Sequence, residues 1–333
     1  MRGTAGRRQF LGALAAAIAS APPCASAQGP APVRRIGFLG PPRSASGFVQ
    51  AFQDGLREHG LVEGRNVVVD YRFTDVALLG DVDGLARLAE ELVALRPDVL
   101  VVSVVEAALA AKRATTSIPI VMVSVADPVG AGLVATLARP GGNVTGLSRQ
   151  GPDIVGKQFQ LLKEALPHTT RVGVLVSPTE PLREVVGRLT RQAAASLGMQ
   201  ATILEPHAPA GLATAFATLR SERVDALLVG GGGAYYLTRV AIAELALRDR
   251  LPTMFQNRES AEAGGLMSYA ASSVANYRRA AFFVDRILSG AKPADLPVEQ
   301  PTKFELVINL KTARALGLTI PRSVLLRADA VVQ

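Results

Sequence analysis

The sequence contains one stretch whose spacing suggests nucleotide chemistry. Residues 151–158 read GPDIVGKQ and match the glycine and lysine spacing of a phosphate-binding loop. Such a loop holds Mg²⁺ with a Ser or Thr, where this chain has Gln158, and Asp153 would place negative charge where phosphates bind. Pro152 and Asp153 are instead typical of a helix start. We therefore expect no nucleotide at this position.

Two further motifs fail on spacing. The run VGGGGAYY at 229–236 has a tyrosine where a dinucleotide fingerprint requires its last glycine. GLSRQG at 146–151 has one residue too many for a nucleophile elbow. The three histidines lack the helical spacing and the Asp or Cys neighbours of a metal site. Without a base beside a nucleophile, the sequence predicts no enzyme, and it indicates no cofactor or metal.

The N-terminus predicts an export signal. Two adjacent arginines are followed by Phe-Leu, an apolar stretch LGALAAAIAS, and the small-residue cleavage pattern ASA at 25–27. The paired arginines are typical of a twin-arginine signal; an ordinary secretory signal is the alternative and gives the same destination. We expect residues 1–27 to be removed and the mature protein to lie in the periplasm.

Composition excludes several functional classes for the mature chain. Its one cysteine, Cys24, falls inside the signal, so disulfides and thiol chemistry are not expected. The formal net charge of +8 falls to about +5 without the signal, and the basic residues are scattered, which argues against a nucleic-acid groove. No later run reaches the roughly 18 apolar residues of a membrane helix. We expect a soluble monomer that meets the membrane only through a permease.

The mature chain is predicted to be α/β, with two halves built to the same plan. Short apolar runs alternate with amphipathic segments, which is typical of βαβ units. The predicted strands are 34–40, 66–73, 98–103 and 118–125 in the first half, and 171–177, 201–206, 225–231 and 251–257 in the second. Repetition of a whole unit indicates duplicated domains.

A glycine pair follows the fourth predicted strand of each half, in GGNVTGLS at 141–148 and GGLMSYAAS at 264–272. Each run leads into a helix-patterned segment, 153–166 or 274–290. If each helix packs on the other half, both glycine-led strands are crossovers that act as hinges; ordinary loops are the alternative. Hydroxyl-bearing residues after the pairs would then lie near the cleft: Thr145, Ser148, Ser268 and Tyr269.

Several longer motifs carry a family likeness. IPIVMVSVADPVGAGLVATLARPGGNVTG, AGGLMSYA and ADLPVEQPTKFELVINLKTARALGLTIP (294–321) occur in order within residues 33–331. The chain thus resembles bacterial ABC-transporter substrate-binding proteins, some of which bind tryptophan or other aromatic amino acids. The resemblance implies a type I periplasmic-binding-protein (Venus-flytrap) fold, with two Rossmann-like lobes joined by three hinge crossovers, the third near 291–303. The expected lobes are 33–148 plus 269–297, and 149–268 plus 298–333.

Open α/β sheets bind ligands at the carboxyl ends of their strands, so the βα turns of both lobes should line the cleft. Asp127 is a candidate partner for an amino group, with a turn cap as the equal alternative. Tyr235 and Tyr269 are candidates to stack on a ligand, with packing as the alternative, and Glu106 is expected to offset a helix dipole. The predicted ligand-binding residues are Ser44, Ser46, Ser103, Asp127, Ser177, Thr179, Gly232, Tyr235, Gln256 and Tyr269.

The favoured hypothesis is an extracytoplasmic receptor that captures a small polar metabolite, closes by hinge motion and delivers it to ABC permease subunits. The glycine run at 230–233 and SPTEP at 177–181 depart from the family pattern, so an aromatic amino acid is only one candidate ligand. A ligand-sensing domain of a regulatory or signalling system is the alternative, although this chain has an export signal where a helix-turn-helix would be needed. A Rossmann-type enzyme is disfavoured by the failed motifs.

Overall fold

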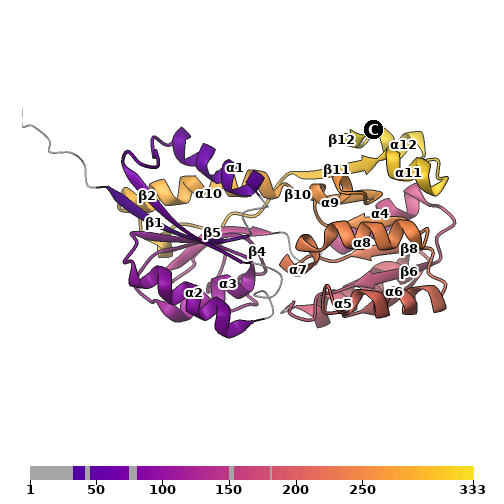
Figure 1. The fold of residues 1–333 in the computed structure, drawn as a ribbon, viewed down its shortest axis with the longest axis horizontal. Coiled ribbons are helices and arrows are strands. Elements are labelled where there is room, and N and C mark those ends of the chain that lie inside the picture. Colours follow the sequence, from indigo (N-terminus) through magenta and orange to yellow (C-terminus); the bar gives the residue numbers. More distant parts are fainter. Residues whose placement is uncertain (1–32, 42–45, 75–80, 150–153, 181) are drawn as a thin grey trace, which may run out of the picture. The chain divides into compact units, whose positions relative to one another are not determined.

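The computed structural model describes residues 33–41, 46–74, 81–149, 154–180 and 182–333 (Figure 1). The predicted signal, residues 1–27, and the predicted site residue Ser44 lie outside the described residues. Two β-sheets are present, and each is covered by helices on both faces. The expected α/β class with two Rossmann-like lobes is therefore confirmed.

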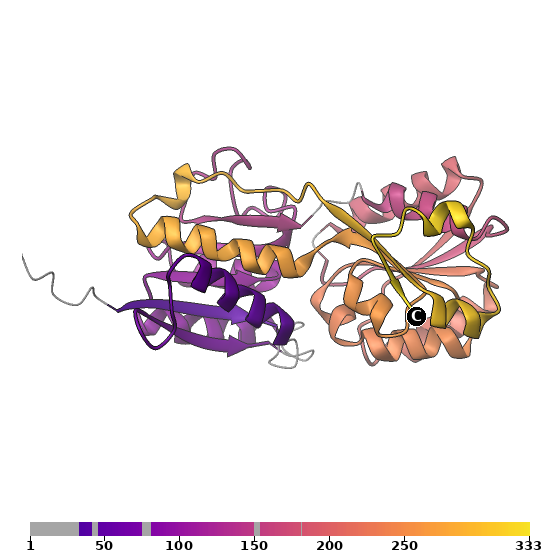
Figure 2. The same cartoon turned by 90° about the horizontal axis from the view of Figure 1, so that it is seen from above.

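The sheet of the first lobe is entirely parallel, in the order β2-β1-β3-β4-β5. Its strands are β1 (Arg34–Gly40), β2 (Val67–Phe73), β3 (Val99–Ser103), β4 (Ile120–Ala126) and β5 (Val144–Arg149). Successive strand residues point to opposite faces, so the apolar runs build two cores. Helices α1 (Ser46–Glu58) and α10 (Ser273–Leu288) cover one core, and α2 (Val82–Ala94) and α3 (Val105–Ala114) cover the other. Figure 2 shows α10 beside α1, although they are far apart in sequence.

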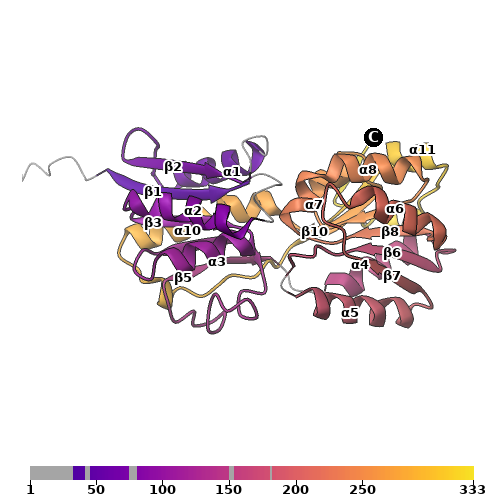
Figure 3. The same ribbon diagram turned by 60° about the horizontal axis from the view of Figure 1, so that its bottom comes forward.

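The sheet of the second lobe has the order β12-β11-β10-β9-β8-β6-β7, and only β10 and β11 pair antiparallel. Its strands are β6 (Arg171–Leu175), β7 (Gln200–Leu204), β8 (Ala226–Val229), β9 (Thr253–Phe255), β10 (Met267–Ala271), β11 (Phe304–Asn309) and β12 (Ala330–Val332). One face packs against α4 (Ile154–Ala165), α5 (Arg183–Ser196), α11 (Leu310–Leu316) and α12 (Arg322–Leu325). The other packs against α6 (Leu212–Ser221), α7 (Gly233–Leu237) and α8 (Arg239–Arg248), as Figure 3 shows; the short α9 (Arg258–Glu262) lies beside β10 and β11.

The order β2-β1-β3-β4 in the first sheet recurs as β7-β6-β8-β9 in the second. The predicted strands of both halves match these eight strands to within a few residues. The repeated plan inferred from the sequence is thus also a repeated topology.

The chain crosses between the lobes three times. β5 belongs to the first sheet, while the helix after it, α4, packs on the second. β10 belongs to the second sheet, while α10 packs on the first. Glu299 still bridges Leu147 of the first sheet before β11 joins the second. The crossing points therefore lie after Ala271 and Glu299, a few residues beyond the predicted 268 and 297.

The backbone conformation explains why a glycine occurs in each of the two pairs. Gly141 has a φ of +77° and Gly264 a φ of +119°, a region that side chains with a Cβ rarely adopt. Both lie just before a strand, β5 or β10, that leads to a crossover. The hydroxyls after the first pair do not face the cleft as expected. Thr145 and Ser148 are buried and donate to the carbonyls of Leu296 (2.6 Å) and Glu299 (3.3 Å). They therefore bind the segment of the third crossover to β5 instead.

Candidate functional site

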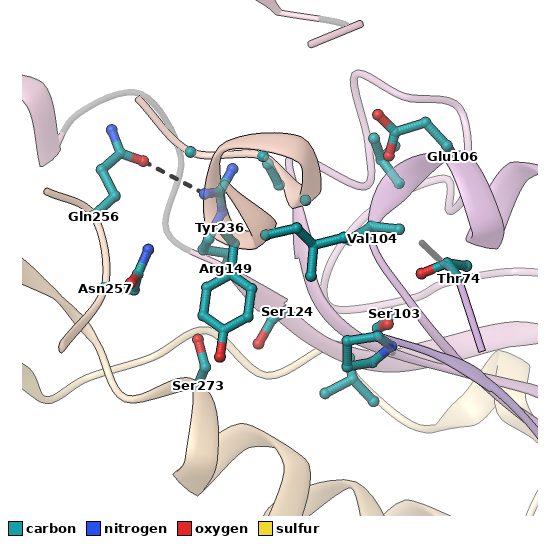
Figure 4. A pocket seen from close by; sticks show the side chains of 18 of the residues that line it. Thr74, Ser103, Val104, Glu106, Ser124, Arg149, Tyr236, Gln256, Asn257 and Ser273 are labelled. Atoms are coloured by element: carbon teal, nitrogen blue, oxygen red, sulfur yellow. Dashed lines mark hydrogen bonds between the residues drawn. The ribbon is translucent and has the colours of Figure 1, made fainter. Parts of the chain in front are cut away.

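The two sheets place their topological switch points at one pocket. In each sheet the strand order reverses at the first strand: β2 and β3 lie on opposite sides of β1, and β7 and β8 lie on opposite sides of β6. Ligands of open α/β sheets bind at the carboxyl ends of such strands. A pocket lies there, with about 940 Å³ of empty space that includes adjoining open solvent (Figure 4). Its lining includes Pro41, Ser103, Ser177 and Gly231, each at or just after the end of one of these four strands. A concave site at this place in an α/β fold is the expected position of a small-molecule ligand.

Arg149 supplies the positive charge of the pocket. It is the last residue of β5, yet its side chain contacts residues of the second lobe. Its Nη1 donates to Oε1 of Gln256 at 3.4 Å (Figure 4), and its Nη2 lies 3.7 Å from Oε2 of Glu180. A Cβ at Gly231 would lie only 1.7 Å from Nη1. The guanidinium therefore occupies space that exists because residue 231 has no side chain.

A buried amide orients the partner of Arg149. Gln158 on α4 is 0% exposed, and its Nε2 donates to the backbone oxygen of Tyr269 at 2.9 Å. Its Oε1 is then free to accept from Nε2 of Gln256 at 3.4 Å. Because the nitrogen of Gln256 donates to Gln158, its oxygen faces the guanidinium. Gln158 therefore positions Gln256, and through it Arg149.

Glu106 supplies a carboxylate from the first turn of α3. Its Oε1 accepts from Oγ1 of Thr179 at 3.1 Å. The same Oγ1 of Thr179 lies 3.0 Å from Oγ of Ser177. Since the single proton of Thr179 goes to Glu106, Ser177 donates to Thr179. Burial raises the pKa of the Glu106 carboxyl above its ordinary value, and the negative charge of Glu180 adds to the rise.

Three aromatic rings form an apolar wall, which we call the aromatic wall: Phe48, Tyr236 and Tyr277. The rings of Phe48 and Tyr277 stack in parallel at 4.9 Å, and Tyr236 lies tilted 5.3 Å from Phe48. The guanidinium of Arg239 lies 4.4 Å from the Tyr236 ring centre. Figure 4 shows Tyr236 among the polar side chains of the pocket. Burial raises the pKa of Tyr236 to about 12, so its hydroxyl stays neutral at physiological pH.

The structure brings half of the predicted site residues to this pocket. Ser103, Ser177, Gly232 and Gln256 line it, and Thr179 joins it through Glu106. Ser46 begins α1, but its side chain is not among those described.

Three other predicted site residues do not line the pocket. Asp127 caps a turn, accepting from the backbone N–H of Gly130 at 2.8 Å. Tyr235 is 2% exposed, and its hydroxyl lies 2.8 Å from the carbonyl of Val176. The ring of Tyr269 packs 5.7 Å from that of Phe304. In each case the structural alternative left open by the sequence accounts for the side chain.

Sequence reasoning missed the charged and aromatic members of the site. Glu106 was placed in a βα turn of the cleft but was expected mainly to offset a helix dipole, while Arg149 and the aromatic wall were not assigned. One signal was available for Glu180, since it directly follows Thr179 in SPTEP, a turn already assigned to the cleft through Ser177 and Thr179. In the described part of the chain, no group of three His, Cys, Asp or Glu residues is placed to hold a metal ion. None of the helices described has the length and apolar character to cross a bilayer.

Comparison with known proteins agrees with this architecture. Residues 42–332 match the family described as ABC transporter substrate binding protein. A tyrosine-binding protein of Clostridioides difficile is 24% identical over 276 residues, which cover 83% of this chain and 77% of that protein. An ABC domain from Streptococcus pneumoniae in complex with L-Trp is 29% identical with a TM-score of 0.82, covering 90% of this chain and 99% of that one.

A conserved domain protein from Vibrio cholerae has a similar structure, at 30% identity and a TM-score of 0.83, again covering 90% of this chain and 99% of that one. These similarities extend over both lobes and both sheets. The relatives named by function are substrate-binding proteins, not enzymes. The chain belongs to the family of ABC transporter substrate-binding proteins.

Proposed function

We propose that this protein is the extracytoplasmic receptor of an ABC importer and that it captures a free amino acid in the pocket. One observation carries the proposal: the pocket combines a guanidinium, two carboxylates and an apolar aromatic wall. A free amino acid carries the complementary set, namely a carboxylate, an ammonium group and a side chain.

Arg149 is the proposed partner of the ligand's carboxylate. Its planar guanidinium is suited to bidentate contact with a carboxylate, and its partners Gln256 and Glu180 hold it at the pocket. A hydrogen bond to a charged group contributes about 1.5–3 kcal/mol. The aromatic wall is the proposed seat of an aromatic side chain, and the relatives that bind tyrosine and L-Trp favour that choice.

Residues of both lobes line the pocket, and this arrangement supports delivery of the ligand to a permease. Ser103 and Phe48 line it from the first lobe, and Ser177 and Tyr236 line it from the second. A ligand that touches both lobes stabilises a closed form, which a permease can distinguish from the empty receptor. In this proposal the three crossovers are the hinges, and the protein works as a monomer in the periplasm.

The decisive test is a melting-temperature screen of the purified protein against the L-amino acids, sugars and purines, followed by calorimetry. An amino acid at 100 times its dissociation constant should add about 2.7 kcal/mol. For a chain of this size that is a shift of roughly 5 °C. Aromatic amino acids should give the largest shifts. Stabilisation by sugars alone, or by no amino acid, would refute the proposal.

Two cellular measurements test the role in transport. Deleting the gene should lower uptake of the radiolabelled amino acid that binds the purified protein. N-terminal sequencing of protein released by osmotic shock should begin at Gln28. Retention of the full chain in the cytoplasmic fraction would contradict the proposed export.

A further inference from the structure

The charges that line the pocket do not balance. In the described part of the chain, three charged residues line it: Arg149, Glu106 and Glu180. Arg149 and Glu180 lie within ion-pair distance at 3.7 Å. Glu106 is left with neutral partners, the hydroxyl of Thr179 and its own backbone N–H. If all three are ionised, the pocket holds one carboxylate more than it holds cations.

An unmatched carboxylate in a partly buried site is costly, because a hydroxyl replaces only part of the water it loses. Glu106 is partly buried, and Thr179 donates to one of its two oxygens. A carboxylate can accept about four hydrogen bonds, so Glu106 has capacity for a further donor. The group that would satisfy both its charge and its hydrogen bonding is a cation.

We propose that Glu106 binds the ammonium group of the ligand, assisted by Glu180 on the other lobe, and that the receptor therefore requires an amino group. The inference rests on the proposed function and identifies how the pocket recognises an amino acid. It gives Glu106 the role that the sequence had offered to Asp127, whose carboxylate caps a turn.

The proposal also explains why the ligand would favour closure. Glu106 lies on α3 of the first lobe, and Glu180 lies between β6 and α5 of the second. Thr179 of the second lobe donates to Glu106, so where the lobes meet the neighbouring Glu180 places a second negative charge near Glu106, which is unfavourable where water is excluded. An ammonium group between them converts this repulsion into two attractions. Closure then depends on the charge of the ligand as well as on its shape.

A pH dependence follows, with a definite sign. Two charged groups act on Glu106: Glu180, which raises the pKa of its carboxyl, and Arg149, which lowers it. An ammonium group stabilises the ionised carboxylate, so binding to a protonated Glu106 releases one proton. Affinity should therefore increase as pH rises through the elevated pKa, by at most about tenfold per pH unit.

The first experiment varies the ligand and leaves the protein unchanged. The chain contains no tryptophan, so indole emission reports an indole ligand without background. L-tryptophan is compared with indole-3-propionate, which lacks the amino group, and with tryptamine, which lacks the carboxylate. Indole-3-propionate should bind at least about a hundredfold more weakly than L-tryptophan, because it leaves Glu106 unpaired. Tryptamine should retain measurable binding that strengthens with pH.

The second experiment varies the carboxylate. Glu106→Gln keeps the shape of the side chain and an oxygen for Thr179 but removes the charge. It should weaken L-tryptophan binding at least about tenfold, leave indole-3-propionate binding little changed, and abolish the pH dependence. Glu184→Gln is the matched control, since Glu184 is also an acidic residue in the first turn of a helix but is exposed and outside the pocket. It should bind as the parent does.

The outcomes separate the two proposals. Binding of indole-3-propionate within threefold of L-tryptophan, or undiminished affinity and pH dependence in Glu106→Gln, overturns the role of Glu106 and leaves amino-acid capture intact. If the Glu106→Gln protein melts far below the parent, the analogue comparison on the parent protein decides alone. If no L-amino acid binds the parent, the proposed function fails and this inference fails with it.

Discussion

Substituting Gly231 by alanine tests the proposed anchor without touching any polar group. An added Cβ would lie 1.7 Å from Nη1 of Arg149, 2.5 Å from Cζ and 2.6 Å from Nη2. Ordinary contact begins at 3.4 Å, so the guanidinium must retreat by about 1.7 Å. That displacement exceeds the tolerance of its 3.4 Å hydrogen bond to Gln256. Losing a charge-assisted contact of about 1.5–3 kcal/mol corresponds to about 10- to 150-fold weaker binding of L-tryptophan or L-tyrosine.

The variant should fold normally. Gly231 is not among the glycines with positive φ, so alanine fits its backbone conformation. Gly156→Ala is the matched control, since Gly156 is an exposed helical glycine with nothing within 4 Å of an added Cβ. Calorimetric titration gives the affinity and thermal unfolding of the empty protein gives the stability. If Gly231→Ala binds as tightly as Gly156→Ala, Arg149 does not hold the ligand in the position we assign to it.

Three further substitutions test the fold and the site. Gly146→Ala should lower the unfolding free energy by about 2 kcal/mol or more, measured by urea titration. The φ of Gly146 is +126°, and an added Cβ would lie 2.2 Å from the carbonyl oxygen of Met122. An unfolding midpoint equal to that of the parent would contradict this predicted strain. Tyr236→Ala should weaken L-tryptophan binding about tenfold or more and have little effect on the binding of a small amino acid. Tyr236→Phe should bind L-tryptophan as the parent does. If Tyr236→Ala weakens the binding of both amino acids equally, the Tyr236 ring does not contact the ligand's side chain. Gln158→Leu should weaken L-tryptophan binding. It should also lower the unfolding free energy by about 1–3 kcal/mol, because it removes the amide that donates to the backbone oxygen of Tyr269. Unchanged affinity would show that Gln158 does not position Arg149.

The sequence predicted the fold well because the fold depends on patterns that are local. Buried parallel strands are continuous apolar runs, and all eight such runs became strands of the two sheets. The glycine pairs were also informative, because a positive φ at Gly141 and Gly264 limits the choice of residue. The lobe boundaries were less predictable. Whether β10 ends in one lobe or the other depends on its pairing with β9 and β11, which is not a local property.

The candidate site was predicted less completely, for a physical reason. The βα-turn rule locates the pocket, and Ser103, Ser177 and Gln256, which it selected, are among the residues that line it. It does not say which way a side chain points. Asp127 follows a first-lobe strand just as Glu106 does, but its own turn uses its carboxylate. Such competition between a local cap and a distant contact is decided by backbone geometry that a single sequence does not reveal.

Arg149 shows why the pocket and the crossovers cannot be treated separately. It ends β5, so the next described element, α4, already belongs to the second lobe. Its partner Gln256 is hydrogen-bonded to Gln158, and Gln158 holds the backbone of Tyr269 in β10, the strand that leads to the second crossover. One side chain is thus connected through two amides to both crossover strands. A carboxylate bound to Arg149 would act on the elements that must bend, whereas an ammonium bound to Glu106 acts between the lobes. Substitutions of Gln256 and Gln158, the two amides of this connection, should therefore alter closure as well as affinity.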